Sequence, residues 1–483
     1  MADRIEDKVL RFSLILPIIT AYAVFLLAGG ESSASAAIFF VFLGLVSFTL
    51  EPVMWVFLSL IILLFVPAEA NLLFTGVSYL LPTGEINLHI LTYFTMGGFL
   101  CWMLSSHEKK INKTPFLRKQ AIVFLLMVAM EIIIELLNIR KEGGISNQLP
   151  DVYIGPILYY FVLVTVLDSE KKNANVRNIF LGILVIIAVF GVQEHFSMNN
   201  FYLSDLLESQ NVSWNNFFMM ELSRGQSYRI MTTLGHPLTN GAYFLAAFVI
   251  IFYSIKRVGR KGLLKPFLAF IFLTALILTM SRGAFVLAGI SIIWSIVGFG
   301  STKKFSRILI FSSIAFAGFF LLQPLIGLLL ERDLLFSDVS ASARFSTITA
   351  LFQGLQNISI LGYGTGNMEE AISVILGGFG NYSLEVGYII VLLQYGLIFL
   401  LLYLYGIFVP IRERTTSLTS FQKAELAPYM VCVALIFIYF GGSNTIGVRS
   451  TINYLFFFVL ALFSSKIMLL KSRRWDREIL QSG

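Results

Sequence analysis

Charged residues are scarce in this chain: they make up 13% of its 483 residues, whereas hydrophobic residues make up 57%. Soluble domains contain about 25% charged residues, so the composition excludes a large soluble domain. Cysteine and histidine are also rare, with two and four copies. Cys101 and Cys432 both lie in apolar stretches and define neither a disulfide nor a metal site. No clustered His, Cys or Asp-x-Asp pattern occurs elsewhere, so we expect no metal and no other cofactor.

Fourteen apolar stretches fill most of the chain. Most approach the roughly 20 residues that a helix needs to cross about 30 Å of hydrocarbon. The first follows a charged decapeptide without a small-residue cleavage site, so we expect a retained helix. We predict an all-α polytopic membrane protein of about 14 transmembrane helices, forming one domain over 1–483. The stretches lie near 12–28, 34–50, 52–67, 88–105, 120–138, 152–167, 178–193, 236–255, 266–280, 283–299, 308–325, 386–409, 426–440 and 452–470.

The cations are divided unequally between the connections. Of the 35 Lys and Arg residues, 27 fall in alternate connections. The positive-inside rule places these connections, and with them both termini, in the cytoplasm. This sorting and the attraction of anionic membrane lipids account for the net charge of +7, so we expect no nucleic-acid partner. The rich connections are the N-terminus, 106–119, 168–177, 256–265, 300–307, 410–424 and the C-terminal tail.

The outer side retains mainly arginine. Lys outnumbers Arg 15 to 12 on the inner side, whereas seven of the eight outer cations are Arg. Arginine grips phosphate oxygens in pairs, whereas lysine offers a point charge. The pattern therefore favours a phosphate-bearing ligand outside. The eight outer cations are Arg140, Lys141, Arg224, Arg229, Arg282, Arg332, Arg344 and Arg449.

Two long connections on the outer side, 194–235 and 326–385, are expected to carry function, because long loops at a membrane surface usually do. The fifth stretch contains Glu131 and Glu135, one helical turn apart. Carboxylates inside a membrane are costly and usually face a bundle interior or water. We favour a structural pairing of these two residues near the outer end over a direct catalytic role.

Four outer segments contain residues suited to chemistry. The first is 224–240, which reads RGQSYRIMTTLGHPLTN. Arg229, His236 and Asn240 surround its Gly-Pro-marked helix start. A histidine before a proline can instead have a purely structural role, in which it caps the helix or packs against a neighbour. Residues 279–285 form the second segment, a tight turn between two stretches. Its arginine, Arg282, can snorkel to lipid headgroups, but the small Ser281 beside it also permits close approach of a ligand or a helix.

The third segment, 343–367, begins with apolar residues at helical spacing, which predicts an amphipathic helix on the membrane surface that holds Arg344 near the headgroups. Gly362, Gly364 and Gly366 follow in a turn whose backbone can approach a ligand closely. The fourth segment, 384–397, places Glu385 at the outer boundary of a stretch. Glu385 is either a plain interfacial residue or a base.

Taken in order, the four segments resemble the bacterial O-antigen ligase and polymerase family, polytopic glycosyltransferases that use polyprenyl-diphosphate-linked sugars. The resemblance covers about 190–400, and the first half of the chain matches only in being hydrophobic. The matching residues are Arg229, Gly235, His236, Pro237 and Asn240, then 281–284, then Arg344 with 362–366, then Glu385, Tyr388, Leu392, Leu393, Tyr395, Gly396 and Leu397.

The resemblance implies a GT-C-like fold in the bacterial cytoplasmic membrane with the active site on its outer face. It also implies a metal-independent transfer of sugar from a polyprenyl-diphosphate-linked oligosaccharide, with a flippase and a chain-length regulator as further partners. Arg229, Arg282 and Arg344 would clamp the diphosphate. Asn240, Ser281, Gly362, Gly364 and Gly366 would help bind the substrate, and Glu385 or His236 would take the proton.

One departure from the family concerns the base. Ligases of this family carry a His-Asn pair where this chain has Glu385-Val386, and polymerases often have an acidic residue there, which favours a polymerase. A competing alignment places the Asn of that pair on Asn381 and leaves no base, but the spacing to Gly396 favours Glu385. The alternatives are a ligase that transfers finished glycan to a lipid, wall or protein acceptor, and a flippase of lipid-linked oligosaccharides. Long, unequal outer loops argue against the flippase.

Overall fold

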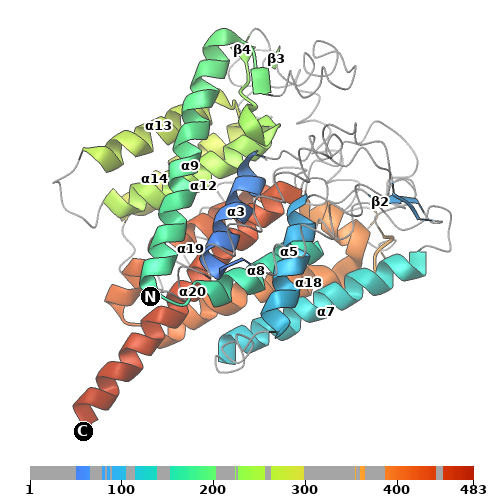
Figure 1. Ribbon diagram of the computed structural model, residues 1–483, viewed down its shortest axis with the longest axis vertical. Helices are drawn as coiled ribbons and strands as arrows, with labels where there is room; N and C mark the ends of the chain where they lie inside the picture. The colour runs from blue at the N-terminus through green and yellow to red at the C-terminus, as the bar shows by residue number, and fades with distance from the viewer. Residues whose placement is uncertain are drawn as a thin grey trace, which may run out of the picture.

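A computed structural model shows a predominantly helical molecule (Figure 1). It describes residues 50–65, 79–81, 84–86, 90–104, 115–138, 153–202, 223–224, 227–255, 263–297, 354, 359–364, 387–441 and 450–482. The predicted stretches at 12–28 and 308–325, and nearly all of 34–50, lie outside these residues. So do the predicted amphipathic helix and three predicted site residues, Arg344, Gly366 and Glu385.

Each described α-helix overlaps one predicted apolar stretch, and several helices extend into the connections predicted at 106–119, 168–177 and 410–424 and into the C-terminal tail. The helices are α3 (Pro52–Phe65), α5 (Ile90–Leu104), α7 (Pro115–Asn138), α8 (Gly155–Val166), α9 (Glu170–Ser197), α12 (Pro237–Ile255), α13 (Leu264–Leu278), α14 (Arg282–Val297), α18 (Gly387–Ser417), α19 (Ser420–Gly441) and α20 (Ser450–Ser482). A short 3₁₀ helix, η2 (Thr232–Leu234), precedes α12. Two antiparallel hairpins complete the described structure: β1 (Tyr79–Leu81) with β2 (Gly84–Ile86), and β3 (Ser223–Arg224) with β4 (Ser227–Tyr228).

Five of the described helices are long and apolar enough to cross a membrane. This confirms that the chain has the character of a multi-pass membrane protein, while the full count of about 14 transmembrane helices stays a prediction. The five segments are Glu170–Ser197, Pro237–Ser254, Gly387–Glu413, Gln422–Phe440 and Thr451–Ser472. Shorter apolar helices are Pro52–Phe65, Gly155–Val166, Leu264–Leu278 and Arg282–Ser295.

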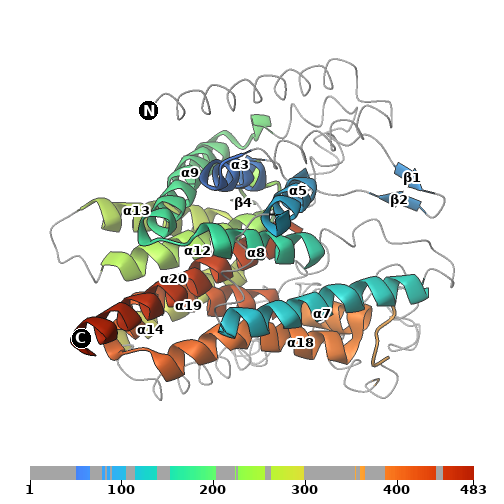
Figure 2. The same ribbon diagram turned by 60° about the horizontal axis from the view of Figure 1, so that its bottom comes forward.

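The centre of the bundle is α20. Residues 455–462 of this helix are fully buried, because α8, α12, α19 and other helices pack around it. On one side α7 and α18 lie along each other, and α3, α5 and α9 lie on the opposite side (Figure 2). The core is rich in aromatic rings, such as Phe124, which meets Phe457 of α20 edge to face at 5.5 Å.

Contacts between helix ends show which ends lie at the same end of the bundle. They define two opposite ends, as expected for helices that alternate in direction. At the first end, where α9 finishes and α12 begins, Glu194 accepts hydrogen bonds from residues just before α12. At the opposite end, Lys466 pairs with Glu170, and Lys471 pairs with Glu413. The second end carries the basic connections, and its assignment to the cytoplasm rests on the positive-inside rule. Helix α9 continues to Ser197, so the connection predicted to begin at 194 starts after this residue.

Helix α18 is broken at Gly396, whose φ of 79° and ψ of 178° are not helical. Residues 359–364 dock onto the break: Tyr363 N donates to Leu393 O at 2.8 Å, and Gly364 N donates to Gln394 O at 2.9 Å. At Gly362, also at positive φ, an added Cβ would collide with the backbone of Gln394. The close approach that this glycine permits is therefore to α18. These bonds satisfy peptide groups on irregular backbone, which is tolerated inside a membrane only where protein or water covers it.

Replacing Gly396 by alanine should destabilise the protein by roughly 1–3 kcal/mol, because a Cβ at this positive φ is strained and would strike Ile360 O. Thermal unfolding in detergent would measure the loss. Gly289→Ala in α14 is the matched control, since nothing lies within 4 Å of its added Cβ. Equal unfolding midpoints for the two variants would contradict the docking.

Candidate functional site

The last turn of α9 holds the segment that leads into α12. The carboxylate of Glu194 is fully buried. Its Oε1 accepts from Met231 N at 2.9 Å and from Tyr228 OH at 2.9 Å, and its Oε2 accepts from Thr232 N at 2.8 Å. Burial first, and then the charge of Glu194, raise the pKa of Tyr228, so this hydroxyl stays protonated and donates. Glu194 thus fixes both flanks of Arg229.

Arg229 lies between α9 and α13, both of which form hydrogen bonds with its segment. It is 6% exposed, and its Nε donates to Thr279 O at 3.2 Å. The next peptide also reaches α13, because Ile230 N donates to Leu278 O at 3.3 Å. One turn before Glu194, Gly191 gives this segment room: an added Cβ would lie 2.9 Å from side-chain atoms of Ile230 and Thr232. The arginine predicted to bind phosphate is therefore held in a fixed place.

Asn240, another predicted site residue, is buried and locks the turn before α12. Its Nδ2 donates to Met231 O at 2.5 Å and to His236 O at 3.0 Å, while its Oδ1 accepts from Thr232 Oγ1 at 2.5 Å. Thr232 has a φ of 49°, a left-handed conformation that a β-branched residue adopts only under such constraints. Asn240 shapes the site through the backbone.

His236 caps the start of α12. Its Nδ1 accepts from Leu238 N at 3.1 Å, which satisfies one of the amides that a helix start leaves without an intrahelical partner. In a neutral imidazole with Nδ1 as acceptor, the proton resides on Nε2. His236 would therefore have to lose this cap before Nδ1 could accept a proton from a substrate.

The tight turn between α13 and α14 packs directly against α12. An added Cβ on Gly241 would lie 3.0 Å from Ser281 Cβ and 3.2 Å from Ala284 Cβ. Ser281 Oγ lies 3.0 Å from Tyr439 OH, which donates to Leu238 O at 2.9 Å. Since that phenol has one proton, Ser281 is the donor to Tyr439. The hydroxyls join the starts of α12 and α14 to the end of α19.

Arg282 begins α14 and is exposed at the same end of the bundle. Met280, two residues earlier, has a φ of 52°. The turn between α13 and α14 thus contains a residue in the left-handed backbone conformation. Phe437 lies two residues before Tyr439 on α19. Its carbonyl oxygen accepts a hydrogen bond from the hydroxyl of Tyr388, at the start of α18. The final turns of α19 therefore connect the starts of three helices, α12, α14 and α18.

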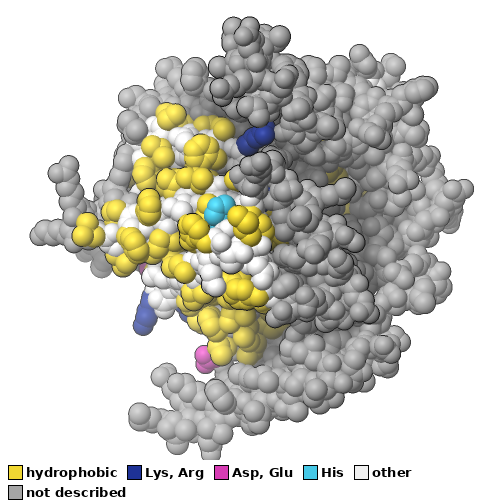
Figure 3. Space-filling view, turned by 90° about the horizontal axis from the view of Figure 1, so that it is seen from above, with side chains coloured by type: hydrophobic (Ala, Val, Ile, Leu, Met, Phe, Trp, Pro, Cys, Tyr) yellow, Lys and Arg dark blue, Asp and Glu magenta, His cyan; other side chains and the backbone are white. Residues whose placement is uncertain are grey.

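The structure brings five predicted residues into one region: Arg229, His236, Asn240, Ser281 and Arg282. The described surface at this end is formed mainly by hydrophobic and other uncharged side chains, with few charged groups (Figure 3). Gly362 and Gly364 lie at the break in α18. Arg344, Gly366 and Glu385 stay predictions outside the described residues.

Glu131 of α7 is buried beside α18, next to the break at Gly396. Tyr395 OH approaches Glu131 Oε1 at 3.5 Å, the outer limit of a hydrogen bond. The surroundings are aromatic: the ring of Tyr153 meets the ring of Tyr395 at 5.3 Å. The side chain of Glu135 is outside the described part, so the pairing of the two carboxylates stays a prediction.

Sequence reasoning missed Glu194 and Tyr439. Glu194 follows the predicted stretch 178–193 by one residue and so falls in a predicted connection, although a carboxylate at the end of a membrane helix is itself a signal. Tyr439 ends a long apolar run and gives no pattern of its own. Comparison of the chain with protein-family models and with curated proteins finds no match.

Removing the Glu194 carboxylate should destabilise the site strongly. Glu194→Ala leaves the buried amides of Met231 and Thr232 without their acceptor, which should cost at least about 2 kcal/mol. Gln193→Ala, on the adjacent exposed residue, is the control. Thermal unfolding in detergent would compare them, and a Glu194→Ala midpoint equal to that of the control would show that the carboxylate does not hold this segment.

Proposed function

We propose that the protein is a polysaccharide polymerase with a GT-C-like fold of about fourteen spans. It joins polyprenyl-diphosphate-linked oligosaccharide repeat units on the outer face of the bacterial cytoplasmic membrane. One observation carries this proposal: segments that resemble the ligase and polymerase family, although far apart in sequence, meet around the end of α19. Arg229 and Arg282 then lie at one end of the bundle, opposite the end that carries the described ion pairs of Lys466 and Lys471.

In the proposed reaction, a hydroxyl of the acceptor unit attacks the anomeric carbon of the donor. A new carbon–oxygen bond forms, the bond from that carbon to the diphosphate breaks, and the hydroxyl proton passes to a base. A diphosphate is already a good leaving group, so charge stabilisation matters more than a strong acid. Arg229 and Arg282, with Arg344, would supply it.

We favour Glu385 over His236 as the base, because the structure gives His236 a structural partner. His236 Nδ1 is engaged by Leu238 N, whereas Glu385 precedes the start of α18 by two residues in sequence. The first turn of that helix touches α19 through Tyr388. A carboxylate close to arginines stays ionised and can accept a proton.

Profiling of lipid-linked intermediates in cells that lack the protein tests this function. A polymerase predicts that single repeat units accumulate on the polyprenyl carrier at the outer leaflet. Finished polymer that remains on the carrier would identify a ligase instead, and repeat units that stay at the inner leaflet would identify a flippase. Either of the latter results overturns the polymerase.

A further inference from the structure

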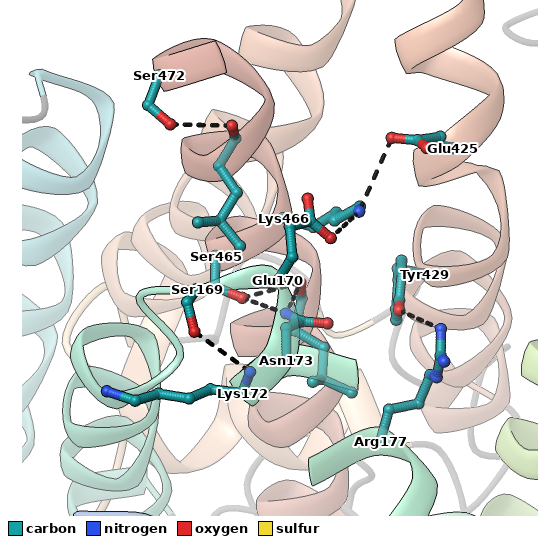
Figure 4. Close-up of polar contacts among 12 residues, drawn as sticks. Ser169, Glu170, Lys172, Asn173, Arg177, Glu425, Tyr429, Ser465, Lys466 and Ser472 are labelled. Atoms are coloured by element: carbon teal, nitrogen blue, oxygen red, sulfur yellow. Dashed lines mark hydrogen bonds and ion pairs between the residues drawn. The ribbon is translucent and has the colours of Figure 1, made fainter. Parts of the chain in front are cut away.

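A second polar site lies at the opposite end of the bundle, where the inner ends of α9, α12, α19 and α20 meet (Figure 4). A cavity of about 50 Å³ opens there between polar side chains. Since a single water needs about 10–15 Å³, the cavity accepts a group several times larger. Its polar lining consists of Arg177, Ser254, Glu425, Tyr429 and Lys466, and two apolar side chains of α12 and α19 complete it.

The ammonium of Lys466 is neutralised by carboxylates. Its Nζ lies 2.5 Å from Glu170 Oε2 and 3.8 Å from Glu425 Oε2. The second distance exceeds that of a hydrogen bond, and Glu425 Oε2 is a buried oxygen without a hydrogen-bond donor among the described residues. Glu425 therefore keeps an acceptor at the cavity for another cationic donor.

Arg177 differs, because its described partners are neutral. Its Nη1 donates to Tyr429 OH at 3.2 Å, and its Nε and Nη2 donate to Asn178 Oδ1 at 3.3 and 3.1 Å. No carboxylate lies within 4.0 Å of the guanidinium in the part of the chain that the structure describes. The charge of Arg177 is thus not compensated by an ion pair there, and a guanidinium is well suited to phosphate oxygens.

The two unlike charges come from different helices, Arg177 from α9 and Glu425 from α19. Glu425 and Tyr429 are four residues apart on α19 and so are neighbours on its surface, about 5–6 Å apart at Cβ. Because Arg177 is bonded to Tyr429, the guanidinium and the Glu425 carboxylate lie at two corners of one cavity (Figure 4). A simple anion would meet the Glu425 carboxylate, and a simple cation would meet Arg177.

We propose that this cavity binds a phosphate group joined to a primary ammonium by a short chain, the chemistry of an ethanolamine phosphate headgroup. Arg177 and Tyr429 would bind the phosphate oxygens, and Glu425 would accept from the ammonium. Basic pockets between membrane helices commonly bind lipid headgroups, and this end of the bundle carries the basic connections. The same chemistry could arrive as a soluble phosphate monoester, so the experiment separates the two sources. The site is independent of the proposed glycosyl transfer.

Native mass spectrometry of the full-length protein would measure the retention of phosphatidylethanolamine against phosphatidylglycerol of the same acyl chains. We expect the wild type to prefer the ethanolamine lipid. Glu425→Gln should reduce this preference about tenfold, equivalent to about 1.4 kcal/mol. Glu413→Gln is the matched control, because Glu413 pairs with Lys471 at the same end of the bundle, away from the cavity. It should leave the preference unchanged.

Tyr429→Phe removes one phosphate donor without removing a charge, and should weaken binding of both lipids while the protein stays folded. Soluble phosphoethanolamine, added in detergent, distinguishes the source: displacement of the lipid at comparable concentration assigns the cavity to the soluble ligand, and failure to displace assigns it to the lipid. Equal retention of the two lipids by the wild type, or an unchanged preference in Glu425→Gln, would overturn the proposal.

Discussion

Replacing Arg229 by lysine is expected to cut polymer formation by roughly 10²–10³-fold, nearly as much as replacing it by alanine. Lysine keeps the positive charge but loses the planar fork that binds two phosphate oxygens together. It also cannot reproduce the bond from Arg229 Nε to Thr279 O while directing further donors outward. The same result is expected for Arg282→Lys and Arg344→Lys. Polymer yield in cells, at matched amounts of membrane-inserted protein, measures the effect.

Arg118→Lys is the control for these variants, since Arg118 is exposed near the start of α7, far along the chain from the four segments. It should leave the yield unchanged. Near-normal polymer from all three of the Lys variants would mean that the arginines act by simple charge attraction or by snorkelling to headgroups. The diphosphate clamp would then have to be abandoned.

Removing the base is the second change with a large expected effect. Glu385→Gln preserves size and hydrogen bonding but cannot accept a proton, and should reduce turnover by roughly two to four orders of magnitude. Binding of the donor should persist, because the arginines that hold the diphosphate are unchanged. Turnover and the binding of undecaprenyl diphosphate, measured on the same preparation, would separate these two effects.

His236→Ala provides the comparison. The variant loses the cap on Leu238 N, so a modest loss of stability, about 1 kcal/mol, is expected along with residual activity. Should Glu385→Gln remain active while His236→Ala is inactive at normal expression, the base is His236. In that case the sequence alignment of the fourth segment is wrong.

The helices were predictable because each long apolar run has one low-energy solution in a membrane, a helix that satisfies its own backbone. Helix α12, predicted at 236–255, begins at Pro237 and ends at Ile255. The break in α18 was not predictable: Gly396 sits inside a continuous apolar run, and the break is stabilised by residues 359–364, which are distant in sequence. Local pattern carries no information about such a partner.

The sequence predicts several polar residues of the site but does not predict their hydrogen-bond partners. Arg229, His236 and Ser281 stand out by their residue types and by their positions beside predicted helix ends on the outer side. Asn240 was expected to bind substrate, yet its described bonds are to the turn before α12. Glu194 and Tyr439, which hold the site together, act only through tertiary contacts.

The most direct test of the proposed function uses the purified protein in liposomes that contain undecaprenyl-diphosphate-linked repeat units from cells lacking the protein. The account predicts that these units are converted into longer lipid-linked chains in the presence of a metal chelator. One undecaprenyl diphosphate should be released for each linkage formed, and the Arg229→Ala protein should form none. Unchanged repeat units with the wild-type protein, or their movement across the bilayer without any new linkage, would contradict it.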